Sequence, residues 1–231
     1  MSLGSVELSV NGSRAVVRRA AGLGLPLVLV PGCGGDHGAL DALVQQLAGC
    51  DVVVICLPGR AGVPGPAPVT AANSAAYVAA VLLSLGVGRA VVGGHSYGGG
   101  IAIELALSHP FLVAGLVLMD TGAKLRAHPD ILSGAEAAAR QDEAMAANLA
   151  DWRACHAFDR MREVSEISVP TLVVTGAEDV LTPPRYARYL GDHILGAEVV
   201  LVAGAGHDAP MTHPAEFAKT IRQFLDARFA S

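Results

Sequence analysis

The sequence has little excess positive charge, few aromatic side chains and no long uninterrupted apolar run. Its 231 residues include 16 Lys and Arg against 21 Asp and Glu, and only 4% are Phe, Trp or Tyr. Nucleic-acid-binding domains present basic surfaces, so this balance argues against a nucleic-acid partner. The most apolar stretch, residues 75–94, is interrupted by Ser84, Gly86, Gly88 and Arg89. It therefore favours a helix followed by a strand over a membrane span, and we expect no membrane association.

The four cysteines follow no recognised pattern. Cys33, Cys50, Cys56 and Cys155 show neither the paired spacing of metal sites nor a Cys-x-x-Cys motif, so we expect free thiols and no metal centre. Residues 1–10 lack a basic segment followed by an apolar run and a small-residue cleavage site. Because those features define a secretory signal, we expect a cytoplasmic location.

Short apolar runs alternate with helical patterns along most of the chain. Hydrophobic residues make up 52% of the sequence, enough for strands that are buried on both faces. Strand alternating with helix predicts an α/β fold with a mostly parallel sheet and helices on both faces. Asn11-Gly12, between the first two strands, predicts an antiparallel hairpin. We expect strands at 6–10, 14–18, 25–31, 51–56, 90–93, 112–119, 169–175 and 198–202, and helices at 40–47, 70–85, 101–107, 184–190 and 214–229.

The alternation pauses between the sixth and seventh predicted strands. We interpret residues 121–168 as a helical lid inserted into a single domain of residues 1–231, with helices expected over 136–149 and 152–162. This segment contains the only tryptophan, Trp152. Its apolar residues suit either contact with a substrate or simple helical packing, and the sequence leaves both open.

The stretch from Val91 to Gly100 carries the clearest chemical signal. A buried strand ends at Gly93, the chain turns through Gly94-His95-Ser96-Tyr97-Gly98, and an apolar helix follows. This context is that of a nucleophile elbow, in which a tight turn lifts a serine hydroxyl clear of the sheet. A glycine-rich turn of a nucleotide-binding protein is the alternative interpretation.

A serine nucleophile needs a base and an orienting carboxylate. His207 follows the last predicted strand in a glycine-flanked loop, and Asp179 follows the strand before it. The carboxyl ends of parallel strands meet at one edge of the sheet, so both residues can approach Ser96. Other candidates remain open: Asp120 and Glu178 for the acid, and His213 for the base.

Two backbone N–H groups are needed to bind the charged oxygen of a tetrahedral intermediate. We expect them to come from Tyr97, which follows the nucleophile, and from Cys33, in the glycine-rich loop after the strand at 25–31. A thiol nucleophile at Cys33 is a further alternative.

With these residues in place, the chain resembles the α/β-hydrolase family over nearly its whole length. The elbow Gly-His-Ser-Tyr-Gly-Gly, the run from Val169 through Asp179 to Pro183, and Gly204-Ala205-Gly206-His207 are similar to the family's motifs in their usual order. The resemblance implies an α/β-hydrolase fold with an eight-stranded sheet and the triad Ser96, Asp179 and His207. The lid is short for that family, which implies a small or open pocket.

These features predict a serine hydrolase that cleaves a small carboxylic ester, lactone or thioester, without cofactor or metal. Trp152 in the lid and Leu181 in the acid loop are the expected substrate contacts. A serine at the elbow argues against dehalogenases and epoxide hydrolases, which the resemblance associates with an aspartate there. C–C bond hydrolysis, a lyase-type reaction, and a ligand-sensing protein with little turnover remain alternatives, because a fold does not determine a reaction. The sequence does not indicate an oligomeric state.

Overall fold

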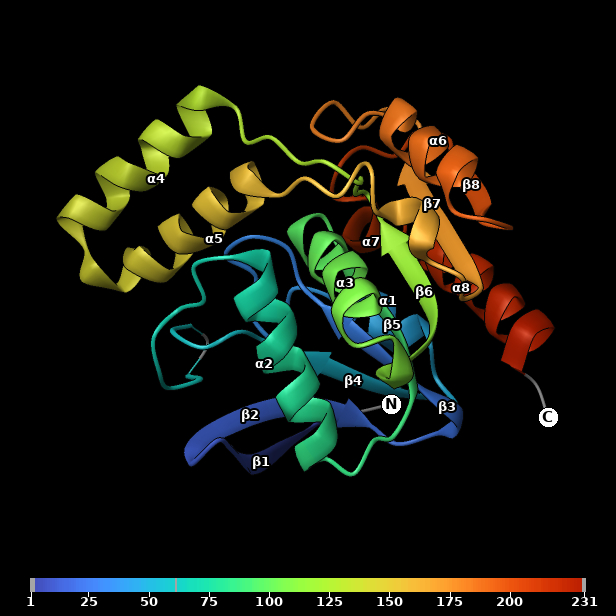
Figure 1. The fold of residues 1–231 in the computed structure, drawn as a ribbon, viewed down its shortest axis with the longest axis horizontal. Coiled ribbons are helices and arrows are strands. Elements are labelled where there is room, and N and C mark those ends of the chain that lie inside the picture. Colours follow the sequence, from blue (N-terminus) through green and yellow to red (C-terminus); the bar gives the residue numbers. More distant parts are fainter. Residues whose placement is uncertain (1–2, 61, 230–231) are drawn as a thin grey trace.

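A computed structural model describes residues 3–60 and 62–229, and these form an α/β structure around one eight-stranded sheet (Figure 1). The strands are β1 (Gly4–Val10), β2 (Ser13–Ala20), β3 (Leu23–Val30), β4 (Cys50–Ile55), β5 (Ala90–His95), β6 (Val113–Met119), β7 (Thr171–Gly176) and β8 (Glu198–Val202). Their order in the sheet is β1-β2-β4-β3-β5-β6-β7-β8. The pairs from β4-β3 to β7-β8 are parallel, which confirms the mostly parallel sheet.

The N-terminal hairpin is also confirmed. β1 and β2 pair antiparallel, with Val10 opposite Ser13, and Asn11 and Gly12 have positive φ values of 50° and 80°. Positive φ at both central positions is characteristic of a type I′ turn, whose twist matches that of the two strands. β2 then pairs antiparallel with β4, which joins the hairpin to the rest of the sheet.

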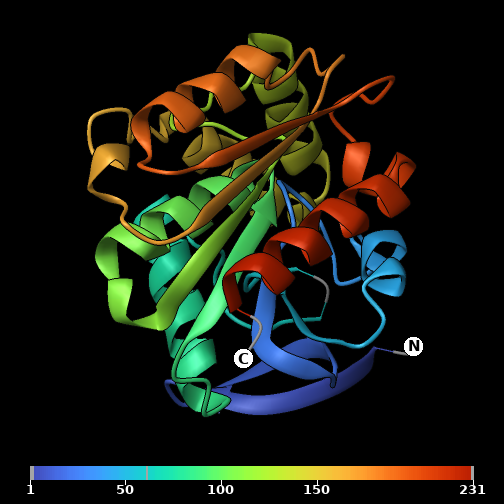
Figure 2. The same cartoon turned by 90° about the vertical axis from the view of Figure 1, so that its right-hand side faces the viewer.

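Helices cover both faces of the sheet (Figures 1 and 2). One face carries α2 (Ala71–Ser84), α3 (Tyr97–Ser108) and α6 (Pro184–His193), and the other carries α1 (Asp41–Gln46), α7 (Ala209–Thr212) and α8 (Pro214–Phe229). Figure 2 shows α8 crossing its face of the sheet with α1 beside it. Within the described residues no helix combines the length and apolarity needed to cross a membrane.

The core is divided by the sheet into two apolar layers. Val28 and Val30 of β3 pack in the layer beneath α2 and α3, whereas Leu27 and Leu29 pack in the layer beneath α1 and α8. This division follows from strand geometry, since successive side chains point to opposite faces. Both layers consist of buried apolar side chains, so the continuous apolar runs of the sequence are explained by strands buried on both sides.

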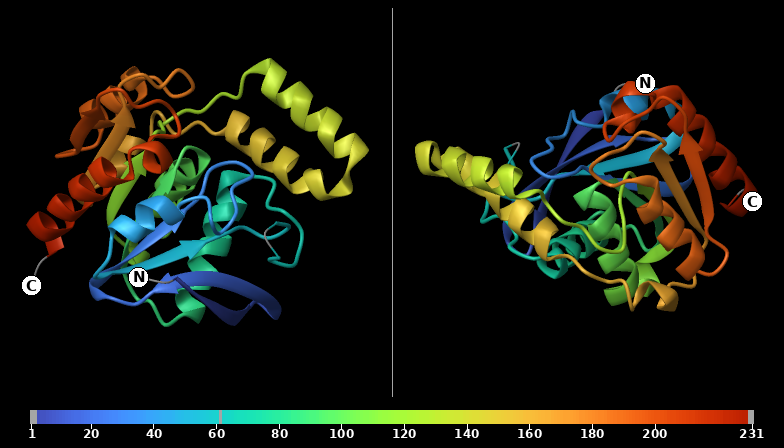
Figure 3. Two further views of the ribbon diagram at one scale, coloured as in Figure 1. Left: turned by 180° about the vertical axis from the view of Figure 1, so that it is seen from behind. Right: turned by 90° about the horizontal axis from the view of Figure 1, so that it is seen from above.

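Between β6 and β7 the chain forms α4 (Pro129–Gln141) and α5 (Ala146–Ala157), which lie side by side and extend away from the sheet (Figure 3). α4 has no buried residue, whereas α5 buries Ala147, Asp151, Ala154 and Cys155. α5 is therefore the inner helix of the pair, and the one whose side chains face the body of the protein.

The expected helix boundaries at 136–149 and 152–162 are wrong. Pro129 occupies the first turn of α4, where its missing N–H costs nothing, and His128 Nδ1 accepts the N–H of Asp130. The break falls at residues 142–145, where no glycine or proline marks it. The elbow helix also begins earlier than expected, at Tyr97 and not at residue 101, because the glycines at 98–100 are helical and allow close packing.

Candidate active site

Ser96 lies at the turn between β5 and α3. Its φ and ψ are 53° and −120°, a conformation that residues other than glycine rarely adopt. Such a strained residue persists only when its surroundings hold it. Here the Thr121 hydroxyl donates to the Ser96 carbonyl at 2.7 Å, and the Ser96 N–H donates to the carbonyl of Met119 at 2.9 Å. The neighbouring strand β6 therefore supports the turn.

Glycine is required on both arms of this turn. A Cβ on Gly94 would lie 2.3 Å from the carbonyl carbon of Gly98, and one on Gly98 would lie 2.0 Å from the carbonyl oxygen of Val30. Both contacts are with backbone atoms, which cannot rotate away. The two glycines thus allow β5, β3 and the first turn of α3 to approach closely, which brings Ser96 beside the loop that follows β3.

We expect Gly98→Ala to destabilise the protein. The added methyl group must displace the end of β3, which should cost about 3 kcal/mol of unfolding free energy. For a chain of this length, that cost lowers Tm by about 6 to 12 °C. Gly88→Ala is the matched control, because a Cβ at Gly88 meets no atom within 4 Å. Equal melting temperatures for the two variants, measured by calorimetry, would contradict this interpretation of the elbow.

His207 and Asp179 are brought to Ser96 as a continuous chain of hydrogen bonds. His207 Nε2 lies 3.0 Å from Ser96 Oγ, and His207 Nδ1 lies 2.9 Å from Asp179 Oδ2. With the proton on Nδ1, the imidazole donates to the carboxylate and accepts from the serine hydroxyl. This is the arrangement in which a histidine can remove the serine proton.

The loop after β7 holds Asp179 as an acceptor on both of its oxygens. Oδ1 accepts the N–H groups of Leu181 and Thr182 at 2.8 and 2.9 Å, and Oδ2 accepts the Thr182 hydroxyl at 2.6 Å. Burial by itself would raise the pKa of Asp179, but the hydrogen bonds from His207 and Thr182 outweigh it and lower that pKa to about 2. The carboxylate is therefore ionised at neutral pH.

The other candidate acids and the other candidate base lie elsewhere. Asp120 is fully buried, and its Oδ1 accepts the N–H of Gly176 at 2.8 Å. Burial raises the pKa of Asp120 to about 7, although that N–H opposes the shift. Glu178 is exposed, and His213 Nδ1 lies 2.9 Å from the Thr212 hydroxyl. In the described residues, the histidine hydrogen-bonded to Ser96 is His207.

His95, the residue before Ser96, connects two loops of the site. Its Nε2 donates to the backbone carbonyl of His207 at 2.8 Å, and the two rings lie 4.9 Å apart between centroids. Burial, and then the neighbouring His207, lower the pKa of His95 to about 4, so its imidazole is neutral. A neutral His95 connects the elbow directly to the loop that carries His207.

The two expected oxyanion donors belong to the first turn of α3 and to the loop after β3. Tyr97 is the first residue of α3, so its N–H has no partner within the helix. The loop that contains Cys33 packs on the elbow, since a Cβ on Gly32 would lie 3.3 Å from Ser96 Cβ. Burial, followed by the nearby Cys155, raises the pKa of the Cys33 thiol well above its usual value, which disfavours a thiolate nucleophile there.

Ser96 and His207 line a cavity of about 310 Å³ that is bordered by α4, α5 and the loop after β7. Trp152 and Leu181, the two expected substrate contacts, both line it. Its other apolar walls come from the segment between β6 and α4, from α4 and from the acid loop. These walls are Leu125, Ala127, Pro129, Ile131 and Val180.

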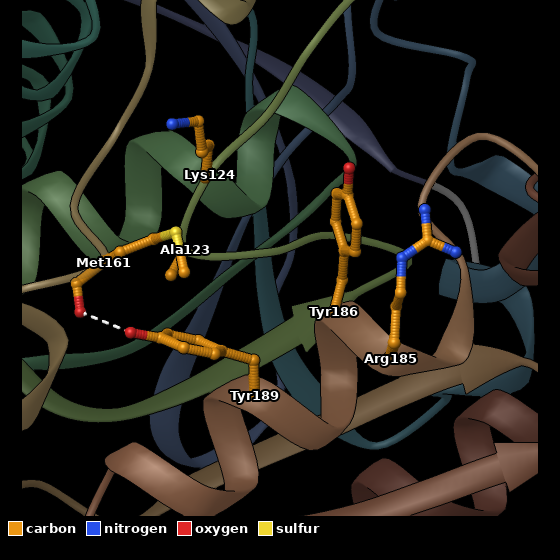
Figure 4. A pocket seen from close by; sticks show the side chains of 6 residues that line it. All are labelled: Ala123, Lys124, Met161, Arg185, Tyr186 and Tyr189. Atoms are coloured by element: carbon orange, nitrogen blue, oxygen red, sulfur yellow. Dashed lines mark hydrogen bonds between the residues drawn. The ribbon is translucent and has the colours of Figure 1, made fainter.

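A separate cavity of about 230 Å³ lies between α6 and the two ends of the lid (Figure 4). The Tyr189 hydroxyl donates to the carbonyl of Met161 at 2.9 Å across it. Ala123, Lys124, Arg185 and Tyr186 complete its lining, and none of these is a predicted site residue. Within the described residues, no group of three or more His, Cys, Asp or Glu is placed to hold a metal ion.

Thr182 and Asp151 are further site-related residues that the sequence analysis missed. Thr182 could have been found, since an aspartate in a turn often accepts the N–H groups of the residues that follow it, as Asp179 does here. Asp151 carries no such signal, because a charged residue on a helix usually faces solvent. In the structure it is buried beneath α5 and accepts the N–H of Gly34 at 3.0 Å.

Comparison with known proteins identifies the family of this chain. The model of the alpha/beta hydrolase family matches residues 27–220. The lipase LipV of Mycobacterium tuberculosis is 30% identical, over 84% of this chain and 90% of its own length. A pimeloyl-acyl-carrier-protein methyl ester esterase of Neisseria meningitidis is 28% identical, over 86% and 92%. The solved structure of a thermophilic esterase is 28% identical, with a TM-score of 0.85 over 98% of both chains. The chain therefore belongs to the alpha/beta hydrolase family and is a hydrolase.

Proposed function

We propose that this protein hydrolyses small carboxylic esters, lactones or thioesters through an acyl-enzyme formed on Ser96. The observation that carries the proposal is the chain of hydrogen bonds from Ser96 through His207 to Asp179, beside a cavity with mostly apolar walls. Relatives named as an esterase and as a lipase support ester cleavage. Ser96, His207 and Asp179 then each have a defined part in the reaction.

In the acylation step, Ser96 Oγ attacks the carbonyl carbon while His207 Nε2 takes the hydroxyl proton. The resulting imidazolium is stabilised by the ionised Asp179, to which Nδ1–H donates. The negative oxygen of the tetrahedral intermediate binds the N–H groups of Cys33 and Tyr97. The intermediate collapses as the bond to the leaving group breaks and His207 returns the proton to the departing alcohol or thiol.

In the deacylation step, water takes the place of the leaving group. His207 removes a proton from the water as its oxygen attacks the acyl carbon, and the same two N–H groups bind the second oxyanion. Collapse of that intermediate breaks the bond to Ser96, and the proton on His207 restores the serine hydroxyl. The free acid leaves through the cavity.

The size of the cavity points to a short acyl group. Its volume is about 310 Å³, at the lower end of the range for ligand pockets. Trp152 from the lid and Leu181 from the acid loop, both of which line it, would contact the acyl chain. Because α5 is packed onto the body of the protein, the wall that Trp152 forms is held in place.

We expect kcat/KM for p-nitrophenyl esters to be highest for acetate or butyrate and to fall through hexanoate to octanoate. Each added methylene that the cavity cannot accommodate removes binding that stabilises the transition state. Initial rates at several substrate concentrations test this series. The variant Trp152→Ala should shift the optimum towards longer acyl chains, since removing the indole side chain enlarges the cavity. A kcat/KM that rises steadily to octanoate in the wild-type protein would contradict a small pocket.

A further inference from the structure

The turn after β3 is held in one conformation by the lid. The Gly35 N–H donates to the carbonyl of Gly32 at 3.0 Å, and Gly34 has a positive φ of 67°. A positive φ at the third residue, with a negative φ at Cys33 before it, is characteristic of a type II turn. In that turn the peptide between Cys33 and Gly34 has a fixed orientation, opposite to that of a type I turn.

The N–H of this peptide has an acceptor on the lid. Gly34 N–H donates to Asp151 Oδ2 at 3.0 Å, and Asp151, on α5, is only 1% exposed. Contact between the lid and the turn is close, since a Cβ on Gly34 would lie 3.0 Å from the side chain of Asn148. Rotating the peptide to the type I orientation would break this hydrogen bond and leave Asp151 Oδ2 paired with Arg60 alone.

The charge of Asp151 is balanced by Arg60, which follows β4 and whose side chain is 10% exposed. This ion pair is not well built for stability. Asp151 Oδ1 and Arg60 Nε are buried and have no hydrogen-bond partner within the described residues. A buried ion pair with unsatisfied atoms is seldom better for stability than apolar side chains of similar size. Stability therefore does not account for the buried carboxylate of Asp151, and its hydrogen bond from Gly34 is the contact that points to a function.

We propose that Asp151 is a positioning residue for the oxyanion loop. By accepting the Gly34 N–H, it anchors the turn at residues 32–35 to α5. The anchored turn holds Cys33 beside the elbow, so that the Cys33 N–H can reach the carbonyl oxygen of a substrate on Ser96. The lid helix α5 thus completes the oxyanion site as well as covering the cavity. This inference rests on the proposed function.

Two double variants separate the hydrogen bond from the ion pair. Arg60→Met with Asp151→Leu removes the charges and the acceptor together. Arg60→Met with Asp151→Asn removes the charges and keeps an oxygen that can accept the Gly34 N–H. Because apolar replacement of a buried ion pair is usually tolerated, both proteins should fold, which their melting curves will establish. They differ chiefly in the acceptor.

With p-nitrophenyl acetate we expect the leucine variant to lose about 10- to 100-fold in kcat, because a donor misplaced by about 1 Å weakens transition-state binding to this extent. KM should change less than about threefold. Inhibition by a boronic acid, which forms a tetrahedral adduct with Ser96, should weaken in parallel with kcat. The asparagine variant should recover most of the lost kcat.

Glu136→Leu with Arg153→Met provides the matched control, since it removes an exposed ion pair between α4 and α5 and should leave kcat and KM unchanged. A folded leucine variant with normal kcat would overturn the proposal. A rise in KM alone would do the same, because it would assign Asp151 to lid closure only. Absence of esterase turnover in the wild-type protein would instead contradict the proposed function, so the two failures are distinguishable.

Discussion

Ser96→Ala is expected to lower kcat for ester hydrolysis by about a millionfold, because removing a triad nucleophile eliminates the covalent route altogether. The hydroxyl is 3.0 Å from His207 Nε2, so the same base that activates it for a substrate also activates it towards a fluorophosphonate. We therefore expect wild-type protein to be labelled by a fluorophosphonate and the alanine variant to remain unlabelled. Intact-protein mass spectrometry measures the adduct directly.

A second serine provides the control for this experiment. Ser108 lies at the other end of α3, and its hydroxyl donates to the carbonyl of Glu104 at 2.7 Å. Ser108→Ala should keep both labelling and turnover. If wild-type protein is not labelled, or if Ser96→Ala is labelled equally, Ser96 is not the nucleophile and the proposed acyl-enzyme must be abandoned.

Asp179→Asn should lower kcat by about 10⁴-fold while the fold is retained. The amide has nearly the same shape as the carboxylate, but it cannot stabilise an imidazolium by charge, and its NH₂ group can favour the wrong tautomer of His207. The loss should appear in kcat more than in KM, since the charge on the imidazole develops only in the transition state. Steady-state kinetics with p-nitrophenyl acetate tests this expectation.

Asp120→Asn is the comparison that decides which carboxylate serves the triad. Asp120 Oδ2 is 4.0 Å from His95 Nε2, and Oδ1 accepts the N–H of Gly176. An asparagine at position 120 can keep the hydrogen bond from Gly176. We therefore expect less than about a tenfold loss in kcat, the size of effect that a small displacement of the catalytic groups produces. A severe loss at Asp120 together with a mild one at Asp179 would reverse the assignment.

The succession of strands and helices along the chain could be predicted because its signals are local. Apolar runs such as residues 51–56 read as strands buried on both faces, and the helical spacing between them implies parallel crossovers. The elbow could be predicted in the same way, since Gly94 and Gly98 are required by contacts that any tight strand-to-helix turn makes. The ends of the helices within residues 121–168 could not be predicted, because no glycine or proline at residues 142–145 marks the end of α4.

The sequence favoured Asp179 as the triad acid but left Asp120 open. Both follow strands, and both come after Ser96 in the chain. What distinguishes them in the structure is distance and hydrogen bonding: the loop after β7 carries the carboxylate to 2.9 Å from His207, whereas the Asp120 side chain is turned towards Gly176. Such orientations depend on backbone torsions that no local pattern encodes.

The sequence by itself determined the fold class, the elbow and the order of serine, acid and histidine, because each depends on neighbouring residues and on where strands end. Tertiary structure alone decided that His95 binds the His207 carbonyl and that Asp151 turns inward to Gly34. The residues of each pair are more than a hundred positions apart in the chain. A contact of this kind arises only when packed elements bring a donor and an acceptor together away from water, where leaving either unpaired is costly.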